Sequence, residues 1–486
     1  MTTSLAQATG NGAVLNSNHR MLSESITTGL VALADAFVIL GSGLLICLLY
    51  AQPDADDLVR YATALLVIAY LVVQSFYIAG LYRFSAILSP SQQIGKLVSI
   101  SAIIFLVVVA AGFALKVSED FSRVWLFGTA IVSVGLMGAI RASTVAIMRR
   151  LASKGRLTRK ILVYGVGEQA ERFIEHVRQM NAPWNRVVGV FDDRRSDASP
   201  EIEGAPFLGD LQGLIRCARE IHADDVIVAL PWRDQRRITQ IISQLKVLPA
   251  NIRLAPEPAL LGILSRSINY QYDVPLASIY DKPLSGWHAV VKRGFDVLVS
   301  ALLLLLTAPL LLALMLCVKL DSQGPIFFRQ RRYGFNNELI GIWKLRTMYV
   351  DQQDQDAERL ASSDDPRVTR VGRFLRRTSL DELPQLFNVL IGDMSLVGPR
   401  PHALKAKAAG ELYQDAVGEY AARHKVKPGI TGWAQVNGWR GETDTREKIL
   451  KRVEHDVYYI EHWSVWLDIR ILLRTFPALI KQENAY

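Results

Sequence analysis

The sequence predicts a membrane protein in which transmembrane helices are joined to an α/β module and a mostly helical α+β C-terminal domain. Three observations predict this fold class: apolar runs long enough to span a bilayer, a stretch that alternates strand-like and helical patterns, and a basic, aromatic C-terminal segment. The 486 residues correspond to roughly three domains of about 150 residues. Of these residues 50% are hydrophobic and 21% are charged, which excludes a disordered or fibrous protein.

The N-terminal third carries the predicted membrane anchor. Apolar runs of the roughly 20 residues that a membrane helix needs lie at 29–50, 62–82, 95–115 and 124–146. We therefore predict an N-terminal tail over residues 1–26 and a four-helix transmembrane region over residues 27–150. The first run begins late and is approached only by Arg20, so a cleavable signal peptide is not expected. An acidic first loop, a short third loop with two acidic and two basic residues, and the basic residues after the fourth run place the chain after residue 146 in the cytoplasm.

A fifth apolar run, at residues 295–318, has the cytoplasmic charge pattern at both ends. Lys292 and Arg293 precede it, and a lysine and several arginines follow it. Pro309 lies near its middle and removes a backbone hydrogen bond there. We expect a re-entrant helix that bends at Ala308-Pro309 and returns to the same face of the membrane. A Pro-kinked helix that crosses the bilayer is the alternative.

Residues 155–255 are predicted to form a Rossmann-like cytoplasmic module, because apolar strand-like runs alternate there with helical stretches. The turn after the first predicted strand reads Gly165-Val-Gly167-Glu-Gln-Ala170, which matches a dinucleotide-binding fingerprint. The proline-containing residues 256–290 are predicted to be a linker.

The fingerprint alone does not establish a dinucleotide site. Asp192 and Asp193 follow at the distance of a ribose-binding acid, but Arg194 and Arg195 would crowd that role. No Tyr-x-x-x-Lys pair for hydride transfer occurs in this segment. A regulatory or structural module that uses its glycines for close packing is therefore favoured, with a working NAD site as the alternative.

The densest group of chemically active side chains lies in the C-terminal segment. Five arginines lead directly into the adjacent acids Asp381 and Glu382: Arg367, Arg370, Arg373, Arg376 and Arg377. Arginine presents a planar fork to phosphate oxygens, and a carboxylate among cations is expected to have a lowered pKa and to stay ionised. Ser379 and Glu382 also match a capping box, and Pro384 suits the first turn of a helix that begins at Asp381. Catalysis at a phosphate-binding helix start is favoured over helix capping alone.

Two turn-rich stretches follow the acids. Arg400 stands between two prolines, so its guanidinium is carried on a stiff loop that suits ligand contacts, or else on a solvated surface turn. Residues 427–440, which end at Arg440, offer backbone donors, amides and aromatic rings to a polar ligand, or else form a tight hairpin. Residues 463–474 predict an amphipathic helix that lies on the membrane surface or packs within the domain.

Several spaced motifs occur in order and together resemble one family. They are Lys292-Arg293-x-x-Asp296, Lys344-x-Arg346-Thr-Met348, Ser379-Leu-Asp381-Glu382-Leu-Pro384-Gln385, Gly398-Pro-Arg400-Pro401 and Lys427-Pro-Gly-Ile-Thr-Gly432. This set resembles the polyprenyl-phosphate hexose-1-phosphate transferases, the monotopic phosphoglycosyl transferases that begin bacterial glycan assembly. The N-terminal helices and the Rossmann-like module resemble the large members of that family, such as the undecaprenyl-phosphate glucose phosphotransferases.

The resemblance implies a catalytic domain over residues 291–486 and a role for each matching residue. Asp381 would attack the β-phosphate of a UDP-sugar, releasing UMP and leaving the sugar-phosphate on the enzyme, and Glu382 would help to hold Mg²⁺. Arg376 and Arg400 would face phosphate, and Arg440 would face the nucleotide-sugar. Undecaprenyl phosphate would then accept the sugar-phosphate, as the first membrane step of exopolysaccharide or capsule synthesis.

The resemblance also implies a multi-pass protein of the bacterial inner membrane, with its catalytic domain on the cytoplasmic face and in contact with membrane lipid. We expect a homo-oligomer, such as a dimer, and no nucleic-acid partner. UDP-glucose is the expected donor, with UDP-galactose as the alternative. Two further hypotheses stay open from the residues alone: a membrane-tethered nucleotide-sugar oxidoreductase, and a non-catalytic scaffold for polysaccharide export.

Overall fold

The computed structural model describes most of the chain as two compact units. The described residues are 24–87, 90–153, 158–179, 184–194, 201–255, 257, 270–271, 274–352, 365–402, 407–408, 411–412, 420–439, 441 and 445–480. One unit lies within Ala13–Thr158 and the other within Arg159–Tyr486. Each unit is described separately below.

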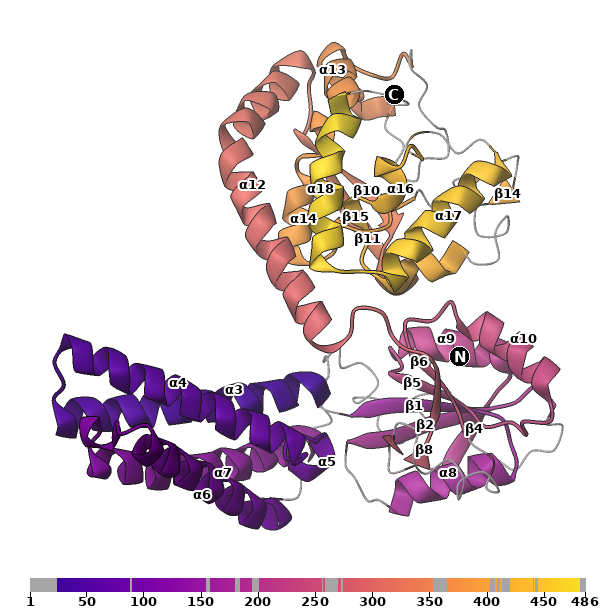
Figure 1. Cartoon of the computed structure of the whole chain (residues 1–486). Helices are drawn as coiled ribbons and strands as arrows, with labels where there is room; N and C mark the ends of the chain where they lie inside the picture. Colours follow the sequence, from indigo (N-terminus) through magenta and orange to yellow (C-terminus); the bar gives the residue numbers. More distant parts are fainter. Residues whose placement is uncertain are drawn as a thin grey trace. The chain divides into compact units, whose positions relative to one another are not determined.

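The first unit is a bundle of apolar helices, drawn in indigo and violet in Figure 1. Its helical segments are α3 (Glu24–Ile46), η1 (Cys47–Ala51), α4 (Ala55–Ile78), α5 (Phe84–Ile87), α6 (Pro90–Ala114), η2 (Ser118–Asp120) and α7 (Arg123–Ser153). α3 packs against α4 and α7, and α6 packs against the same two helices. The apolar runs predicted from the sequence overlap α3, α4, α6 and α7, each of which is long and apolar enough to cross a membrane.

The outer face of this bundle is apolar. Phe37, Ile78 and Ile131 are 70%, 84% and 73% exposed, although each is a large hydrophobic residue. Exposure of such an apolar surface to water is unfavourable in free energy, whereas its contact with lipid tails is not. Inside the bundle, Arg141 of α7 forms two hydrogen bonds with Asp35 of α3, at 2.9 and 2.7 Å. The chain is therefore a membrane protein in which Arg141 and Asp35 form an ion pair in the bundle interior.

The second unit begins with an α/β module. Its elements are β1 (Arg159–Tyr164), α8 (Glu168–Gln179), β2 (Asn185–Phe191), β3 (Glu201–Ile202), β4 (Ala205–Gly209), α9 (Leu211–Glu220), β5 (Asp225–Val228), α10 (Gln235–Leu245), β6 (Asn251–Leu254), β7 (Tyr270–Gln271), β8 (Val274–Pro275) and β9 (Ala277–Tyr280). The described strands of the main sheet follow the order β3-β4-β2-β1-β5-β6-β9. The pairs from β4 to β6 are parallel, and the edge strands β3 and β9 are antiparallel to their neighbours. Figure 1 shows α8 on one side of this sheet and α9 and α10 on the other, as the predicted α/β pattern requires.

The predicted linker at residues 256–290 is partly wrong. β9 lies inside this range and pairs with β6, so the module continues to Tyr280 instead of ending at residue 255. The helix α12 then begins at Gly286. A four-residue edge strand has little pattern of its own and depends on its partner strand, which explains why the sequence did not indicate it. Residues 258–269 lie outside the described residues.

The C-terminal domain is built on α12 and two small sheets. Its elements are α12 (Gly286–Asp321), β10 (Phe327–Tyr333), η4 (Phe335–Asn337), β11 (Leu339–Leu345), η5 (Val350–Gln352), α13 (Arg370–Thr378), η6 (Leu380–Glu382), α14 (Gln385–Ile391), β12 (Ser395–Val397), β13 (Lys407–Ala408), β14 (Glu411–Leu412), η7 (Tyr420–Lys425), β15 (Gly429–Thr431), α16 (Trp433–Val436), α17 (Arg446–Glu461) and α18 (Val465–Ile480). β10 and β11 form an antiparallel hairpin, and β12 pairs in parallel with β15. The parallel pair places the loop after β12 beside the segment after β15, although the two are distant in the sequence.

The apolar run at residues 295–318 lies inside α12, which contains Pro309 and which Figure 1 shows as an arc. Both halves of this helix contact the same domain. Near its start, Lys292 donates hydrogen bonds to groups on β12 and α18. In its second half, Leu311, Leu314 and Val318 belong to the apolar cluster that contains Leu345 of β11.

Candidate active site

The two adjacent acids lie at a sharp turn between α13 and α14. Ser379 has a left-handed backbone (φ 57°) and ends α13, and its N–H bonds to the carbonyl of Arg376 at 3.1 Å. The chain then makes the single 3₁₀ turn η6, which contains both acids, and α14 begins after Pro384. Ser379 makes no side-chain capping hydrogen bond to η6. The predicted capping box is therefore wrong, because the left-handed residue turns the chain before a new helix can form.

Glu382 forms a close ion-pair network with two cations from other elements. Lys344 of β11 places its Nζ 2.9 Å from Oε1, and Arg400 places Nη2 2.6 Å from the same oxygen. Arg400 Nη1 also donates to Oε2 at 3.2 Å. The guanidinium of Arg400 and the ammonium of Lys344 thus hold the side chain of Glu382 in one orientation.

Asp381 has a different environment, although it is next in the chain. It is buried, and its nearest described cation is Lys344, with Nζ 3.9 Å from Oδ2. Burial raises the pKa of Asp381 to about 6, and the charge of Lys344 opposes this rise. Burial would also raise the pKa of Glu382, but Arg400 and Lys344 outweigh it and lower that pKa.

The predicted lowering of both acid pKa values is therefore right for Glu382 and wrong for Asp381. The cations lie closer to Glu382, and the negative charge of Glu382 further disfavours ionisation of Asp381. Asp381 is therefore the less easily ionised of the two acids. The site thus holds one fixed anion beside a second carboxylate without a close ion pair, which leaves that carboxylate available as a nucleophile.

Of the five arginines that precede the acids in the sequence, one lies beside them in the structure. Arg376 donates from Nε to Thr347 Oγ1 at 2.9 Å, and its charge interacts with that of Asp381. Arg367 instead pairs with Asp365 at 2.6 Å. The other three are exposed: Arg370, Arg373 and Arg377. Arg367 precedes α13, and Arg370, Arg373 and Arg377 share its exposed face because they are three and four residues apart.

The loop that carries Arg400 follows β12 directly. Gly398 lies against β15 so closely that a Cβ on Gly429 would be 2.1 Å from the backbone nitrogen of Gly398. Arg423 donates to the carbonyl of Arg400 at 2.8 Å and pairs with the buried Asp456 at 2.6 Å. Arg400 is therefore held at its backbone as well as its side chain, and the alternative of a solvated surface turn is wrong.

Arg440 lies outside the described residues, but both of its neighbours are described. The side chain of Arg452 donates to the carbonyl of Trp439 at 3.0 and 2.7 Å and to that of Gly441 at 2.9 Å. The preceding segment is not the alternative tight hairpin, since β15 pairs with β12 and the short helix α16 follows it.

The chemistry of the two acids fits Mg²⁺, which prefers oxygen ligands and is commonly held by one or two carboxylates together with substrate phosphates and water. Asp381 and Glu382 provide two adjacent carboxylates, and Glu382 already accepts hydrogen bonds from Lys344 and Arg400. Among the described residues, no group of three or more His, Cys, Asp or Glu side chains is placed to hold a metal ion alone. A cation at this site would therefore depend on phosphate oxygens of the substrate.

Packing within the module accounts for the first glycine of the Gly165–Ala170 fingerprint. A Cβ on Gly165 would lie 2.3 Å from the carbonyl oxygen of Ala229, so glycine is needed for close approach to β5. The N–H of Val166 bonds to Asp192 at 3.0 Å, and Arg237 pairs with the same carboxylate at 2.5 Å. Asp192, one of the two acids considered for a ribose, is thus engaged by the protein, and Gly167 and Ala170 lie in the same turn and helix start.

Comparison with known proteins separates the C-terminal domain from the rest of the chain, but it does not separate the helical bundle from the α/β module. Residues 287–482 match the family described as bacterial sugar transferase, and residues 77–256 match a CoA-binding domain. A relative from Escherichia coli K12, a UDP-glucose:undecaprenyl-phosphate glucose-1-phosphate transferase, is 42% identical over 386 residues, which are 78% of this chain and 80% of the relative. The chain belongs to the bacterial sugar transferase family.

Two further relatives of this sugar transferase carry related names. An undecaprenyl-phosphate glucose phosphotransferase from Komagataeibacter xylinus is 43% identical over 332 residues, which are 68% of this chain and 61% of the relative. An undecaprenyl-phosphate galactose phosphotransferase from Salmonella typhimurium is 31% identical over 387 residues, which are 76% of this chain and 77% of the relative. The similarity extends well beyond the C-terminal domain.

The sequence reasoning did not assign a role to two groups that complete the sugar transferase site. Lys344 was noted within a motif, but its contact with Glu382 spans 38 residues of sequence. Thr347, which orients Arg376, lies just beyond the same strand. Besides that motif, the sequence offered one signal, a lysine in an otherwise apolar strand, which is an unusual place for a charge.

Proposed function

We propose that this sugar transferase transfers glucose-1-phosphate from UDP-glucose to undecaprenyl phosphate and releases UMP. One observation carries the proposal: Asp381 and Glu382 meet Lys344 and Arg400 inside the domain that matches the bacterial sugar transferases. The relatives from E. coli and K. xylinus are named for glucose and undecaprenyl phosphate, whereas the less similar Salmonella relative is named for galactose. Glucose is therefore the favoured sugar and galactose the second candidate.

In the first step, the ionised carboxylate of Asp381 attacks the β-phosphorus of UDP-glucose. A bond forms between a carboxylate oxygen and phosphorus, the bond from that phosphorus to the bridging oxygen breaks, and the bridging oxygen leaves with UMP. Arg400 and Arg376 present planar donors to the phosphate oxygens. Mg²⁺ held with Glu382 would neutralise negative charge on those oxygens.

In the second step, a phosphate oxygen of undecaprenyl phosphate attacks the same phosphorus and displaces Asp381. The product is undecaprenyl diphosphate glucose, and the carboxylate returns to its starting state. Lys344 keeps Glu382 in place throughout, because its ammonium bonds to Oε1 without depending on either substrate. Splitting the transfer into two displacements lets a water-soluble donor and a lipid acceptor use the same nucleophile in turn.

The proposed acceptor requires the site to lie at a membrane surface. Both halves of α12 pack on the C-terminal domain, which supports a re-entrant helix that enters the membrane and returns to the same side. The lysines and arginines at both ends of the run support the cytoplasmic side of the bacterial inner membrane. UDP-glucose is then available from the cytoplasm and the lipid phosphate from the bilayer interface.

The reaction is tested with membranes that contain the full chain, supplied with UDP-glucose, undecaprenyl phosphate and Mg²⁺. We expect release of UMP, a slower release with UDP-galactose, and none from Asp381→Asn. Asp351→Asn, an exposed acid on η5 of the same domain, is the matched control and should release UMP at the normal rate. Absence of UMP release by the native chain would refute the proposal.

The covalent step has its own test. With UDP-glucose labelled in the β-phosphate and without undecaprenyl phosphate, the native chain should retain label after denaturation, and Asp381→Asn should not. Addition of undecaprenyl phosphate before denaturation should remove the label from the protein. UMP release that depends on the acceptor from the first turnover, with no label on the chain, would instead indicate direct transfer.

A further inference from the structure

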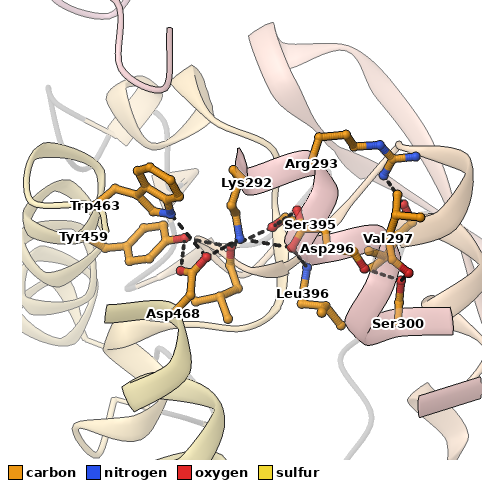
Figure 2. A network of polar contacts seen from close by, with 12 residues as sticks. Lys292, Arg293, Asp296, Val297, Ser300, Ser395, Leu396, Tyr459, Trp463 and Asp468 are labelled. Carbon is orange, nitrogen blue, oxygen red and sulfur yellow. Dashed lines mark hydrogen bonds and ion pairs between the residues drawn. The ribbon is translucent and has the colours of Figure 1, made fainter. Parts of the chain in front are cut away.

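A buried polar cluster joins the start of the membrane helix to the strand before Arg400. Figure 2 shows its members pointing toward one another, and they come from α12, β12, α17 and α18. We define the α12–β12 cluster as Lys292 and Asp296 of α12, Ser395 of β12, Tyr459 of α17 and Asp468 of α18. All of these side chains are buried. None of them reaches Asp381 or Glu382 through a described contact, so the proposed mechanism does not use them directly.

Lys292 is the centre of this cluster. Its Nζ lies 2.7 Å from Asp468 Oδ2 and 3.1 Å from Asp296 Oδ1, and it donates to the carbonyl of Val397 at 3.1 Å. An ammonium group has three donors, and all three are used here. Tyr459 adds hydrogen bonds to Asp468 at 2.8 Å and to the carbonyl of Val397 at 2.9 Å. The charges are thus paired by groups from α12, α17 and α18.

Asp296 binds the same strand from the other side. Its Oδ2 accepts from the hydroxyl of Ser395 at 2.8 Å, and its Oδ1 accepts from the backbone N–H of Leu396 at 3.1 Å. Together with the bonds to Val397, three consecutive residues of β12 are held by side chains of the cluster. Gly398, Pro399 and Arg400 follow at once, so the position of β12 sets the position of the Arg400 guanidinium.

The next residue of α12 holds the opposite side of the active site. Arg293 donates to the carbonyls of Val389 and Leu390 near the end of α14, the second of these at 2.6 Å. α14 begins three residues after Glu382. Lys292 and Arg293, which are neighbours on α12, therefore bind the two segments next to Arg400 and next to the proposed catalytic acids.

We infer that Lys292, with Asp296 and Asp468, positions Arg400 against Glu382 and so couples the seating of the membrane helix to the phosphate-binding site. A buried ammonium with two carboxylates often contributes no more to folding stability than apolar side chains of the same volume would. Unlike apolar side chains, the hydrogen-bonded cluster also fixes the relative positions of α12 and β12. The inference rests on the proposed function, because it assigns Arg400 to the phosphates of UDP-glucose.

The test is a double-mutant cycle in the full chain that combines Lys292→Met with Arg400→Ala. If Lys292 acts through Arg400, Lys292→Met lowers kcat/KM for UDP-glucose by about tenfold in the native background and by less than about twofold when Arg400 is already alanine. Lys292→Arg, which keeps the charge, should recover part of the loss. Lys451→Met, at an exposed lysine of α17, is the matched control and should leave kcat/KM unchanged.

The amount of folded protein is measured for each variant by size-exclusion chromatography in detergent, and rates are expressed per folded chain. If Lys292→Met does not fold, Asp296→Asn replaces it in the same cycle, because it preserves volume and weakens the hold on Ser395 and Leu396. Equal losses in both Arg400 backgrounds would overturn the inference, as would native activity in Lys292→Met.

Failure of the proposed function is distinguishable from failure of this inference. The cycle is read both in turnover and in the affinity for UDP-glucose. A native chain that binds UDP-glucose but releases no UMP would refute the proposed function, and the coupling in affinity would still decide the role of Lys292. Additive effects on affinity, with normal UMP release by the native chain, would refute the positioning role alone.

Discussion

Asp381 and Glu382 differ because of what faces them, although they are identical in charge and adjacent in sequence. Glu382 receives Lys344 and Arg400 at hydrogen-bond distance, whereas Asp381 is buried with its nearest described ion-pair partner at 3.9 Å. The sequence singled out these two adjacent carboxylates as candidates. It did not indicate which of them would be fixed and which would be available, because the cations that decide this lie 38 and 18 residues away.

Removal of Lys344 should therefore reduce turnover through Glu382. Lys344→Met leaves Glu382 with one cation, and we expect kcat/KM for UDP-glucose to fall by roughly ten- to a hundredfold, as for loss of a group that orients a reacting centre. Lys344→Arg should lose less. Steady-state UMP release measures this effect, and a Lys344→Met chain with native kcat/KM would contradict the assigned role.

The raised pKa of Asp381 predicts an acidic limit to activity. Only the ionised carboxylate attacks, so kcat/KM should fall as the pH decreases through about 6 at low Mg²⁺ concentration. A nearby cation favours the ionised form, so saturating Mg²⁺ should move this limb to lower pH. The measurement is a pH profile of UMP release at several Mg²⁺ concentrations. An acidic limb that does not move with Mg²⁺ would indicate a group other than Asp381.

At the scale of elements, the parallel pairing of β12 with β15 brings the Arg400 loop and the segment before Arg440 together. A Cβ on Gly429 would be 2.1 Å from Gly398 N and 2.5 Å from Thr431 O, which are backbone atoms that have no room to move. The glycines in this pair were visible in the sequence as turn formers. Their role in close strand contact became evident only once the two strands were placed side by side.

Gly429→Ala should therefore separate β12 from β15 and displace Arg400. We expect destabilisation of a few kcal/mol, in the range of overpacked positions, and a loss of UMP release that exceeds the loss of folded protein. Gly294→Ala is the matched control, because nothing lies within 4 Å of its added Cβ and it is an exposed helical position. Thermal unfolding and UMP release per folded chain measure the two effects. Equal stability of the two variants would contradict the close-contact argument.

The topology of α12 is a second prediction at this scale. In a chain whose three cysteines are replaced by serine, Ser285→Cys and Ser322→Cys mark the two ends of the helix. For a re-entrant helix, a membrane-impermeant maleimide should label neither position in intact cells and both after permeabilisation. Labelling of Ser322→Cys alone in intact cells would show that α12 crosses the membrane.

At the scale of the whole molecule, both units pair their buried charges. In the C-terminal domain Lys292 pairs with Asp296 and Asp468. In the membrane bundle Arg141 of α7 pairs with Asp35 of α3, and Tyr82 also donates to Asp35 at 2.9 Å. The sequence indicated the apolar runs around these residues. It could not show that two charges 106 residues apart would neutralise each other inside the bundle.

Removal of either Asp35 or Arg141 alone should lower the free energy of unfolding by more than removal of both. Asp35→Asn or Arg141→Met leaves an uncompensated polar or charged group in the bundle and should lower the free energy of unfolding by about 3–5 kcal/mol, whereas the double variant should recover much of this loss. Arg60→Met, which breaks the exposed pair with Asp57, should have little effect. Thermal unfolding in detergent is the measurement, and additive single effects would contradict the pairing.

Local features allowed the sequence alone to establish much of this protein. Runs of apolar residues, loop charges and the alternating α/β pattern indicated the membrane helices and the module, because each depends on near neighbours in the chain. The adjacent acids and the proline-flanked arginine were recognisable for the same reason. Only the tertiary structure decided that β9 belongs to the module's sheet, that one of five clustered arginines lies beside the acids, and that Lys344 completes the site. These features depend on contacts between distant segments, whose geometry is set by packing and by the pairing of buried charge.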